Sequence, residues 1–234
     1  MDQCRVPSNL LMEALPSIER DRLTSYATEI DLAENNILHE AARPIEFVYF
    51  PHQGLISLIV VTPNKAMAEA GFVGCEGAIG TSYDLDTRAS FTRSVVVVGG
   101  TALRLPLARF ERLLEQSAVL RRLVSQNNNR ITERGQQMAA CNLLHRLEER
   151  VCRWLLQSVE HGGGSDVMIT QDDLAHMLGV SRARLNETLK SLQALEAIAT
   201  GQRGILRIRD AGLVARHACP CFEVMKAMVV EECC

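Results

Sequence analysis

The chain has 234 residues, enough for one large domain or two ordinary ones, and 47% of them are hydrophobic, as in folded globular proteins. No apolar run approaches the roughly 20 residues that cross a membrane. The start, Met1 to Arg5, has no apolar segment, so we expect no signal peptide and a cytoplasmic protein without membrane contact. The net charge of −3 excludes a chain that is basic throughout, although a local basic patch is compatible with it.

The N-terminal part changes from a short helical stretch to a series of β-strands. Apolar positions recur with helical spacing between Asn9 and Ala27, and Pro16 should divide them into two short helices. From Thr28 to about Pro106, turn residues separate short β-prone segments. These segments are Ile45–Phe50, Leu55–Val61, Met67–Phe72, Thr92–Val98 and Ala102–Leu105. The pattern predicts a many-stranded β domain, most simply a jelly roll or barrel.

A helical rhythm returns at Leu107 and continues, with breaks, to about Val159. Within it, positions spaced alternately by four and three residues are Leu120, Val124, Asn127, Ile131, Arg134, Met138, Cys141 and His145. We favour a dimer seam between two such helices, in which a buried Asn fixes the register. The alternative is a long helix that packs on its own domain by one amphipathic face. The run Gly162–Ser165 then ends the helix and marks a domain boundary.

The next segment predicts two helices joined by a tight turn. Thr170 begins a capping-box-like start, and Ser181 is placed to cap the second helix. Gly179 allows the sharp turn between them. This is the pattern of a helix-turn-helix, and Ile198–Thr200 with Ile205–Ile208 adds a β-hairpin after it.

Polar side chains that can read bases or bind phosphates gather at the start of the second helix. Arg and Asn pair with guanine and adenine edges in the major groove, and Glu accepts from cytosine. Between Ser181 and Arg209 the chain has six basic and two acidic residues, a local positive field that attracts phosphate. The candidate DNA-binding residues are Gln171, Ser181, Arg182, Ala183, Arg184, Asn186, Glu187, Lys190 and Arg203. The alternatives are an ordinary helical hairpin with a charged face and, for Arg203, a solvated turn residue.

A β-rich N-terminal domain, a long central helix and a C-terminal winged helix, in this order, resemble the Crp/Fnr transcription regulators. The similarity is strongest over Gln171–Leu192. The segment Ala140–Leu156, together with Arg203–Asp210 and Ala218–Phe222, looks like a branch of that family with no well-defined effector. The resemblance implies an α+β fold with three parts. Residues 1–116 would form a cyclic-nucleotide-binding-like β jelly roll, 117–161 a central dimerisation helix and hinge, and 162–234 a winged helix-turn-helix DNA-binding domain.

The resemblance also implies a function that is not enzymatic. A homodimer would place two recognition helices in successive major grooves of a palindromic promoter site in double-stranded DNA, and RNA polymerase would be a further partner. Ser181 and Arg182 match the family's start of the recognition helix, whereas Ala183 stands where Glu is common, so the half-site should differ. The alternative is a cyclic-nucleotide or redox sensor module whose winged helix mediates protein contacts.

The candidate effector site matches the family less well. Its cyclic-nucleotide binders carry a Gly-Glu-Leu turn, whose Glu holds a ribose hydroxyl, and a later Arg that pairs with the cyclic phosphate. This chain offers Glu76, Gly77 and Arg88, but with other spacing and neighbours. The alternative makes Glu76 a turn residue and Arg88 a solvated loop charge. We identify no cofactor, and we rank cyclic-nucleotide binding below that alternative.

The eight cysteines include no CxxC pair and predict reduced thiols rather than a disulfide framework. His217, Cys219 and Cys221 are close in sequence, with Cys233 and Cys234 at the end. Two cysteines at i and i+2 on a helix point about 200° apart, so they chelate poorly unless the helix breaks between them at the intervening proline. We therefore expect buried structural thiols here and no metal site.

Overall fold

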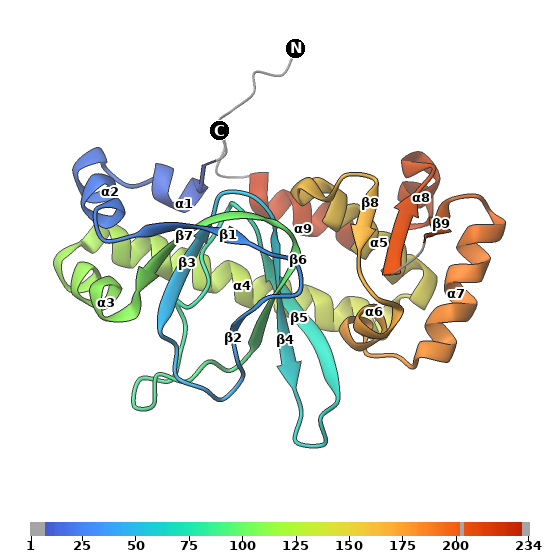
Figure 1. The fold of residues 1–234 in the computed structure, drawn as a ribbon, viewed down its shortest axis with the longest axis horizontal. Helices are drawn as coiled ribbons and strands as arrows, with labels where there is room; N and C mark the ends of the chain where they lie inside the picture. Colours follow the sequence, from blue (N-terminus) through green and yellow to red (C-terminus); the bar gives the residue numbers. More distant parts are fainter. Residues whose placement is uncertain (1–7, 202–203, 231–234) are drawn as a thin grey trace, which may run out of the picture.

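The computed structural model describes residues 8–201 and 204–230. The described chain begins with α1 (Leu10–Glu13) and α2 (Ser17–Thr24), which are separated at Pro16 as the sequence predicts. Proline has a fixed φ and no backbone N–H, so it interrupts one helix and can precede the next. Both helices lie at one end of the molecule next to α3 (Leu107–Gln116), with which they share an apolar cluster (Figure 1).

Residues 28–106, all of them described, form a three-stranded sheet in the order β1-β7-β3 and a four-stranded sheet in the order β2-β6-β4-β5. The strands are β1 (Thr28–Leu32), β2 (Ile37–His39), β3 (Phe47–Pro51), β4 (Leu55–Val61), β5 (Met67–Val73), β6 (Arg93–Val98) and β7 (Gly100–Pro106). All neighbours are antiparallel, and Leu32 and Ala102 of one sheet pack with Ile56 and Val96 of the other. This jelly-roll-like sandwich confirms the predicted α+β fold class.

Helix α4 (Ala118–Leu144) runs along the length of the molecule and packs against β5 (Figure 1). Its side chains at Leu120, Val124, Asn127, Arg134, Met138 and Cys141 are buried within the single chain. The predicted dimer seam is therefore wrong, because these positions face the protein's own sheet and C-terminal helices. A spacing of four and three residues marks the covered face of a helix, but it does not say whether the same chain or a second copy covers it.

Helix α5 (Leu147–Ser158) follows α4 after a short break and passes into a π-helical turn, η1 (Val159–Gly163). Gly162 there has φ +94°, a left-handed conformation that glycine adopts without a side-chain clash. The glycine run thus ends the helix where the sequence predicts, and the chain enters β8 (Asp166–Met168).

The C-terminal part contains α6 (Gln171–Leu178), α7 (Arg182–Ala194), β9 (Ile198–Thr200), β10 (Ile205–Ile208), α8 (Ala211–His217) and α9 (Cys221–Val230). Strands β9 and β10 form the predicted antiparallel hairpin, and β8 adds a strand on the other side of β10. Sequence analysis missed β8, because three residues are too few to show the alternation of a strand.

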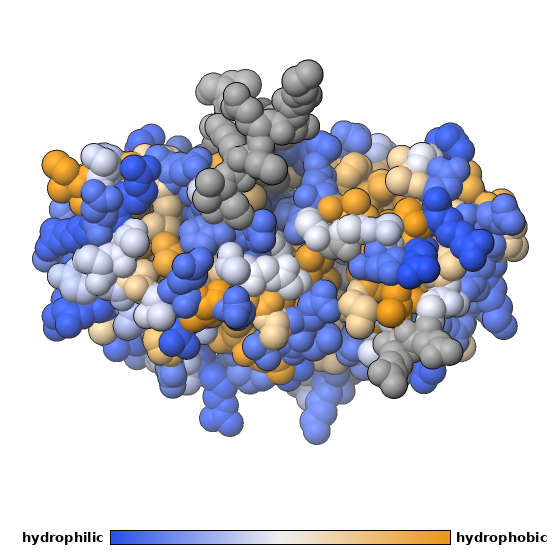
Figure 2. Space-filling model, turned by 45° about the horizontal axis from the view of Figure 1, so that its top comes forward, coloured by the Kyte–Doolittle hydropathy of each residue, from blue (hydrophilic) through white to orange (hydrophobic). Residues whose placement is uncertain are grey.

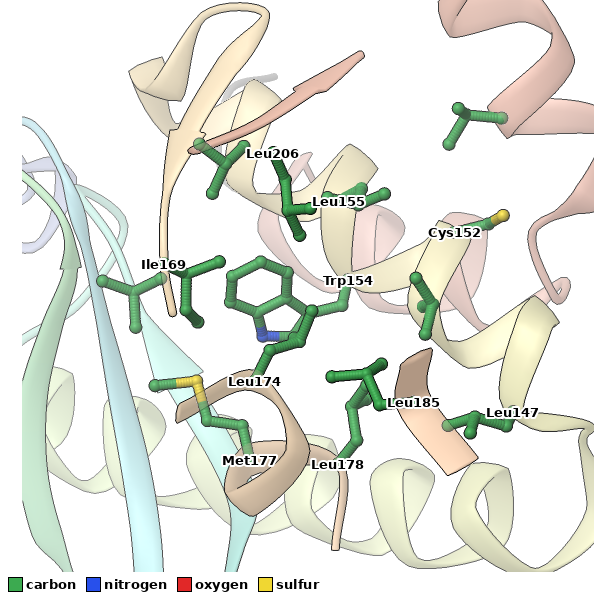
Figure 3. Packing of buried hydrophobic residues seen from close by; sticks show 14 of the residues in the cluster. Leu147, Cys152, Trp154, Leu155, Ile169, Leu174, Met177, Leu178, Leu185 and Leu206 are labelled. Carbon is green, nitrogen blue, oxygen red and sulfur yellow. The ribbon is translucent and has the colours of Figure 1, made fainter. Parts of the chain in front are cut away.

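One apolar core joins this part to the sandwich. The buried side chain of Trp154 on α5 lies among Ile169, Leu174 and Leu206 (Figure 3). The same cluster includes Leu55 of β4 and several other sandwich residues, and α6 packs against β5. The helix-turn-helix part is therefore docked against the four-stranded sheet.

On the face that Figure 2 shows, hydrophobic residues lie in scattered patches among hydrophilic ones. None of the helices that the described residues form is long and apolar enough to cross a bilayer.

Candidate functional site

Local capping fixes the geometry of α6 and α7. The Thr170 side chain accepts a hydrogen bond from the Asp173 backbone N–H at 3.1 Å, and the Ser181 side chain accepts one from Arg184 N at 3.3 Å. Gly179 ends α6 in the left-handed conformation, with φ +64°. The caps and the turn are those that the sequence predicts, and together they set the two helices as a helix-turn-helix.

The outer face at the start of α7 is open to solvent. Leu185, Leu189 and Leu192 face the core. The exposed residues on the other side are Ser181, Arg182, Ala183, Arg184, Glu187 and Lys190, while Gln171 at the start of α6 and Asn186 are half-buried. Eight of the nine sequence-predicted DNA-binding residues thus lie on α6, on α7 or at its cap Ser181, and each is exposed or half-buried. The ninth, Arg203, lies outside the described residues.

Ion pairs reduce the positive charge that a residue count suggests. Arg182 Nη1 lies 3.2 Å from Asp172 Oδ2, and more than half of each side chain is exposed. Arg207 on β10 pairs with Asp166 at 2.6 Å. Neither Arg184 nor Lys190 forms an ion pair with another residue in the described part of the chain. Because no carboxylate neutralises them, their positive charges can attract a phosphate.

A buried ion pair holds the turn after β5 to the central helix. Glu76 Oε1 accepts from Arg134 Nη1 at 2.6 Å, and the carboxylate also accepts from the Gly74 backbone N–H at 3.1 Å. The Arg134 guanidinium lies over the Phe72 ring, 4.8 Å from its centre. The side chains of Glu76 and Arg134 are 3% and 2% exposed, so each charge depends on the other.

His161 of η1 completes this group, with its Nε2 atom 3.8 Å from Glu76 Oε2. Burial disfavours the charged carboxylate, but Arg134 and His161 outweigh burial and hold the pKa of Glu76 well below its usual range. Burial also disfavours the charged imidazole, but the hydrogen bond and charge of Glu76 prevail and raise the pKa of His161.

The three candidate effector residues do not converge on one ligand position. Gly77 lies against α4, where a Cβ atom would come within 2.5 Å of Asn127 Oδ1. Asn127 Oδ1 accepts from the Ala78 N–H at 3.0 Å, so this close approach joins the turn to α4. Arg88 is in a loop, half exposed, and its Nη2 lies 2.9 Å from Glu111 Oε2 of α3.

A cavity of about 390 Å³ lies beside Glu76, between the sandwich and the C-terminal part. His52, Phe72 and His161 line it, and α9 contributes Phe222, Met225 and Lys226. Neither Gly77 nor Arg88 is among its lining residues. A ligand here would therefore touch the sandwich and α9 at once.

Sequence analysis did not assign Arg134, Asn127 or His161 to this site. Both Arg134 and Asn127 were predicted to lie in the dimer seam. A polar side chain at a buried helical position needs a hydrogen-bond partner, and this was the signal that both have partners within the chain. Sequence analysis also did not foresee that Cys141 and His145, at the end of α4, lie beside Cys219 and Cys221.

The comparisons with known proteins agree with this architecture. Residues 149–215 match the family model of the Crp-like helix-turn-helix domain. A putative transcriptional regulator of the Crp/Fnr family from Eubacterium rectale superposes with a TM-score of 0.67 at 12% identity, over 88% of this chain and 96% of that one. No curated protein sequence matches the chain.

Two further solved structures share the fold. A regulator of the CRP family from Thermus thermophilus gives a TM-score of 0.66 at 17% identity, over 81% of this chain and 96% of that one. The c-di-GMP-responsive global regulator CLP from Xanthomonas campestris gives 0.63 at 15% identity, over 83% and 100%. The chain therefore contains a Crp-like helix-turn-helix domain at residues 149–215, and along most of its length it has the fold of solved Crp/Fnr regulators.

Proposed function

We propose that the protein regulates transcription by binding a palindromic site in double-stranded DNA as a homodimer. The observation that carries the proposal is the open face at the start of α7, where Arg182, Arg184 and Lys190 are exposed while the leucines behind them are buried. A helix held in this way can enter a major groove, so that its first residues meet base edges and its lysine meets a phosphate.

The exposed face of α4 supports the dimer. Its solvent-facing positions are also spaced by four and three residues, at Ala118, Arg122, Ser125, Asn129, Thr132, Gln136, Ala139 and Leu143. Leu143 and Leu144 are 86% and 78% exposed in the single chain, an apolar pair that a second copy of α4 would cover. We place the dimer contact on this face.

The cavity beside Glu76 is the proposed sensor site. It lies between the sandwich and α9, so a ligand held there changes how the DNA-binding domain sits on the sheet. Phe72, Phe222 and Met225 give the cavity an apolar wall, and Glu160 and Lys226, which lie 2.6 Å apart, give it a polar edge. The regulated step in this proposal is transcription by RNA polymerase in the cytoplasm.

Selection of bound fragments from sheared host DNA, with purified reduced protein, tests the proposal. We expect enrichment of a two-fold symmetric site. On that site Arg182→Ala should weaken binding by about 1–3 kcal/mol and relax the base preference at one position of each half-site.

Arg216→Ala is the matched control, because Arg216 is an exposed arginine on α8 and not on α7. It should keep the base preference of the unchanged protein. If no fragment is enriched by folded protein, with or without added cyclic nucleotide, the alternative of a sensor whose winged helix contacts proteins replaces the proposal.

A further inference from the structure

Four potential metal ligands from two distant parts of the chain meet at the end of α4. The Sγ atoms of Cys141, Cys219 and Cys221 and a ring nitrogen of His145 all lie within 4.8 Å of one another. Cys141 Sγ and Cys219 Sγ are 3.5 Å apart, and Cys221 Sγ is 3.5 Å from His145 Nδ1. The three cysteines are at most 3% exposed, whereas His145 is half-buried at the rim.

The fold removes the geometric objection that sequence analysis raised. Helix α8 ends at His217 and α9 begins at Cys221, so the helix is broken around Pro220. The side chains of Cys219 and Cys221 therefore need not point in opposite directions, as they would on one continuous helix. Cys141 lies in the last turn of α4 and His145 is the residue that ends the helix, and the His145 backbone N–H donates to Cys141 O at 3.1 Å, which holds the two residues close together. His217 is not part of the group, because its Nδ1 lies 2.9 Å from Glu148 Oε1.

Three thiolates and one imidazole are the ligand set of a tetrahedral zinc site. With Zn–S bonds of about 2.3 Å, the corners of such a tetrahedron are about 3.7 Å apart, which is close to the two 3.5 Å separations observed here. Hydrogen-bonded free thiols would not require the imidazole, and a disulfide between Cys141 and Cys219 would leave Cys221 and His145 unused.

The surroundings suit the charge of that site. Three thiolates leave a bound zinc ion with a net negative charge, and the positive charge of buried Arg153 acts on both Cys141 and Cys219. Arg153 Nε has no hydrogen-bond partner among the described residues. Gln137 Nε2 donates to Cys221 Sγ at 3.1 Å, the kind of outer contact that orients a metal ligand.

We propose that Cys141, His145, Cys219 and Cys221 bind one zinc ion. The ion ties the start of α9 to the last turn of α4, next to the break that leads into α5. Because α9 also lines the cavity beside Glu76, the ion fixes one wall of that cavity and the seat of the DNA-binding domain. This assignment is independent of which DNA or ligand the protein recognises.

Metal analysis of the full chain, purified reduced and without chelator, tests the site. We expect about one zinc per chain in the unchanged protein, and less than a tenth of that in Cys219→Ser and in His145→Ala. Cys152→Ala is the matched control, because Cys152 is a buried thiol on α5 outside the group, and it should keep the full zinc content. Far-ultraviolet circular dichroism checks that each variant is folded.

Cobalt binding to the unchanged protein gives a second result that needs no variant to fold. Reduced, metal-free protein should take up Co²⁺ with the absorption of a tetrahedral thiolate site, and Zn²⁺ should displace it. Uptake of neither ion, iron in place of zinc, full zinc retention in both ligand variants, or a Cys141–Cys219 disulfide that blocks metal binding would each overturn the proposal.

Discussion

At the scale of single residues, Glu76 has a structural role because its side chain, although it belongs to a turn, is buried beside Arg134. A carboxylate and a guanidinium that are both buried stabilise the fold only as a pair, because removal of one leaves the other without a counter-charge. The pair joins the turn after β5 to α4, and His161 adds a contact from η1. Three elements thus depend on one carboxylate.

His161 makes the stability of this group depend on pH. Its pKa in the folded protein is raised, so the protonated imidazole contributes stability that is fully present below the unfolded value of about 6.5. That contribution is lost as the pH rises through the folded pKa, at about 1.4 kcal/mol for each unit by which the pKa is raised.

We therefore expect the free energy of urea unfolding to fall in the unchanged protein as the pH rises above about 6.5, and to fall less in His161→Gln. His176→Gln is the control, because His176 is exposed on α6, and it should keep the slope of the unchanged protein. Equal slopes in all three proteins would show that His161 is not the group that titrates.

At the scale of elements, α4 carries two faces with the same spacing and different partners. Asn127, Arg134 and Cys141 lie on the face that the chain covers itself, each with a polar or sulfur partner there. The opposite face is left to solvent and ends in two exposed leucines. Polar residues at buried positions therefore fix the register of α4 on its own sheet, and the second face remains for association.

The dimer prediction belongs to this second face. We expect Leu143→Glu to convert a dimer into monomers at micromolar concentration, because two like charges would meet across the two-fold axis. Sedimentation velocity measures the change. Ile18→Glu is the control, because Ile18 is 82% exposed on α2 far along the chain, and it should leave the dimer intact. Dissociation by both substitutions, or by neither, would place the contact elsewhere.

At the scale of the whole molecule, one apolar cluster includes side chains of both the sandwich and the C-terminal part. Trp154 on α5 shares its apolar cluster with side chains of α6, β10 and the four-stranded sheet (Figure 3). Since Trp154 is the single tryptophan of the chain, its fluorescence reports on the place where the parts meet. A substitution that destabilises one part should therefore also destabilise the other.

We expect unfolding curves from Trp154 fluorescence and from far-ultraviolet circular dichroism to coincide. Leu55→Ala, in the fully buried start of β4, should lower the free energy of unfolding by about 2–5 kcal/mol and move both curves together. If the fluorescence curve stays in place while the dichroism curve moves, the sandwich and the helix-turn-helix domain unfold independently.

The amino-acid sequence by itself determined the local structure: the break at Pro16, the strand segments, the caps at Thr170 and Ser181, and the turn at Gly179. Each of these features depends on residues a few positions apart, so it can be predicted from the propensities and capping hydrogen bonds of neighbouring residues. The outer face of α7 followed from the same periodicity.

Only the tertiary structure decided which partner covers α4, what neutralises Glu76, and where the cysteines meet. Glu76 and Arg134 are 58 positions apart, and Cys141 and Cys219 are 78. Contacts between distant segments depend on how whole elements pack, and periodicity only says that a face is covered. For the same reason a helix break between Cys219 and Cys221 became meaningful only when the end of α4 was found beside it.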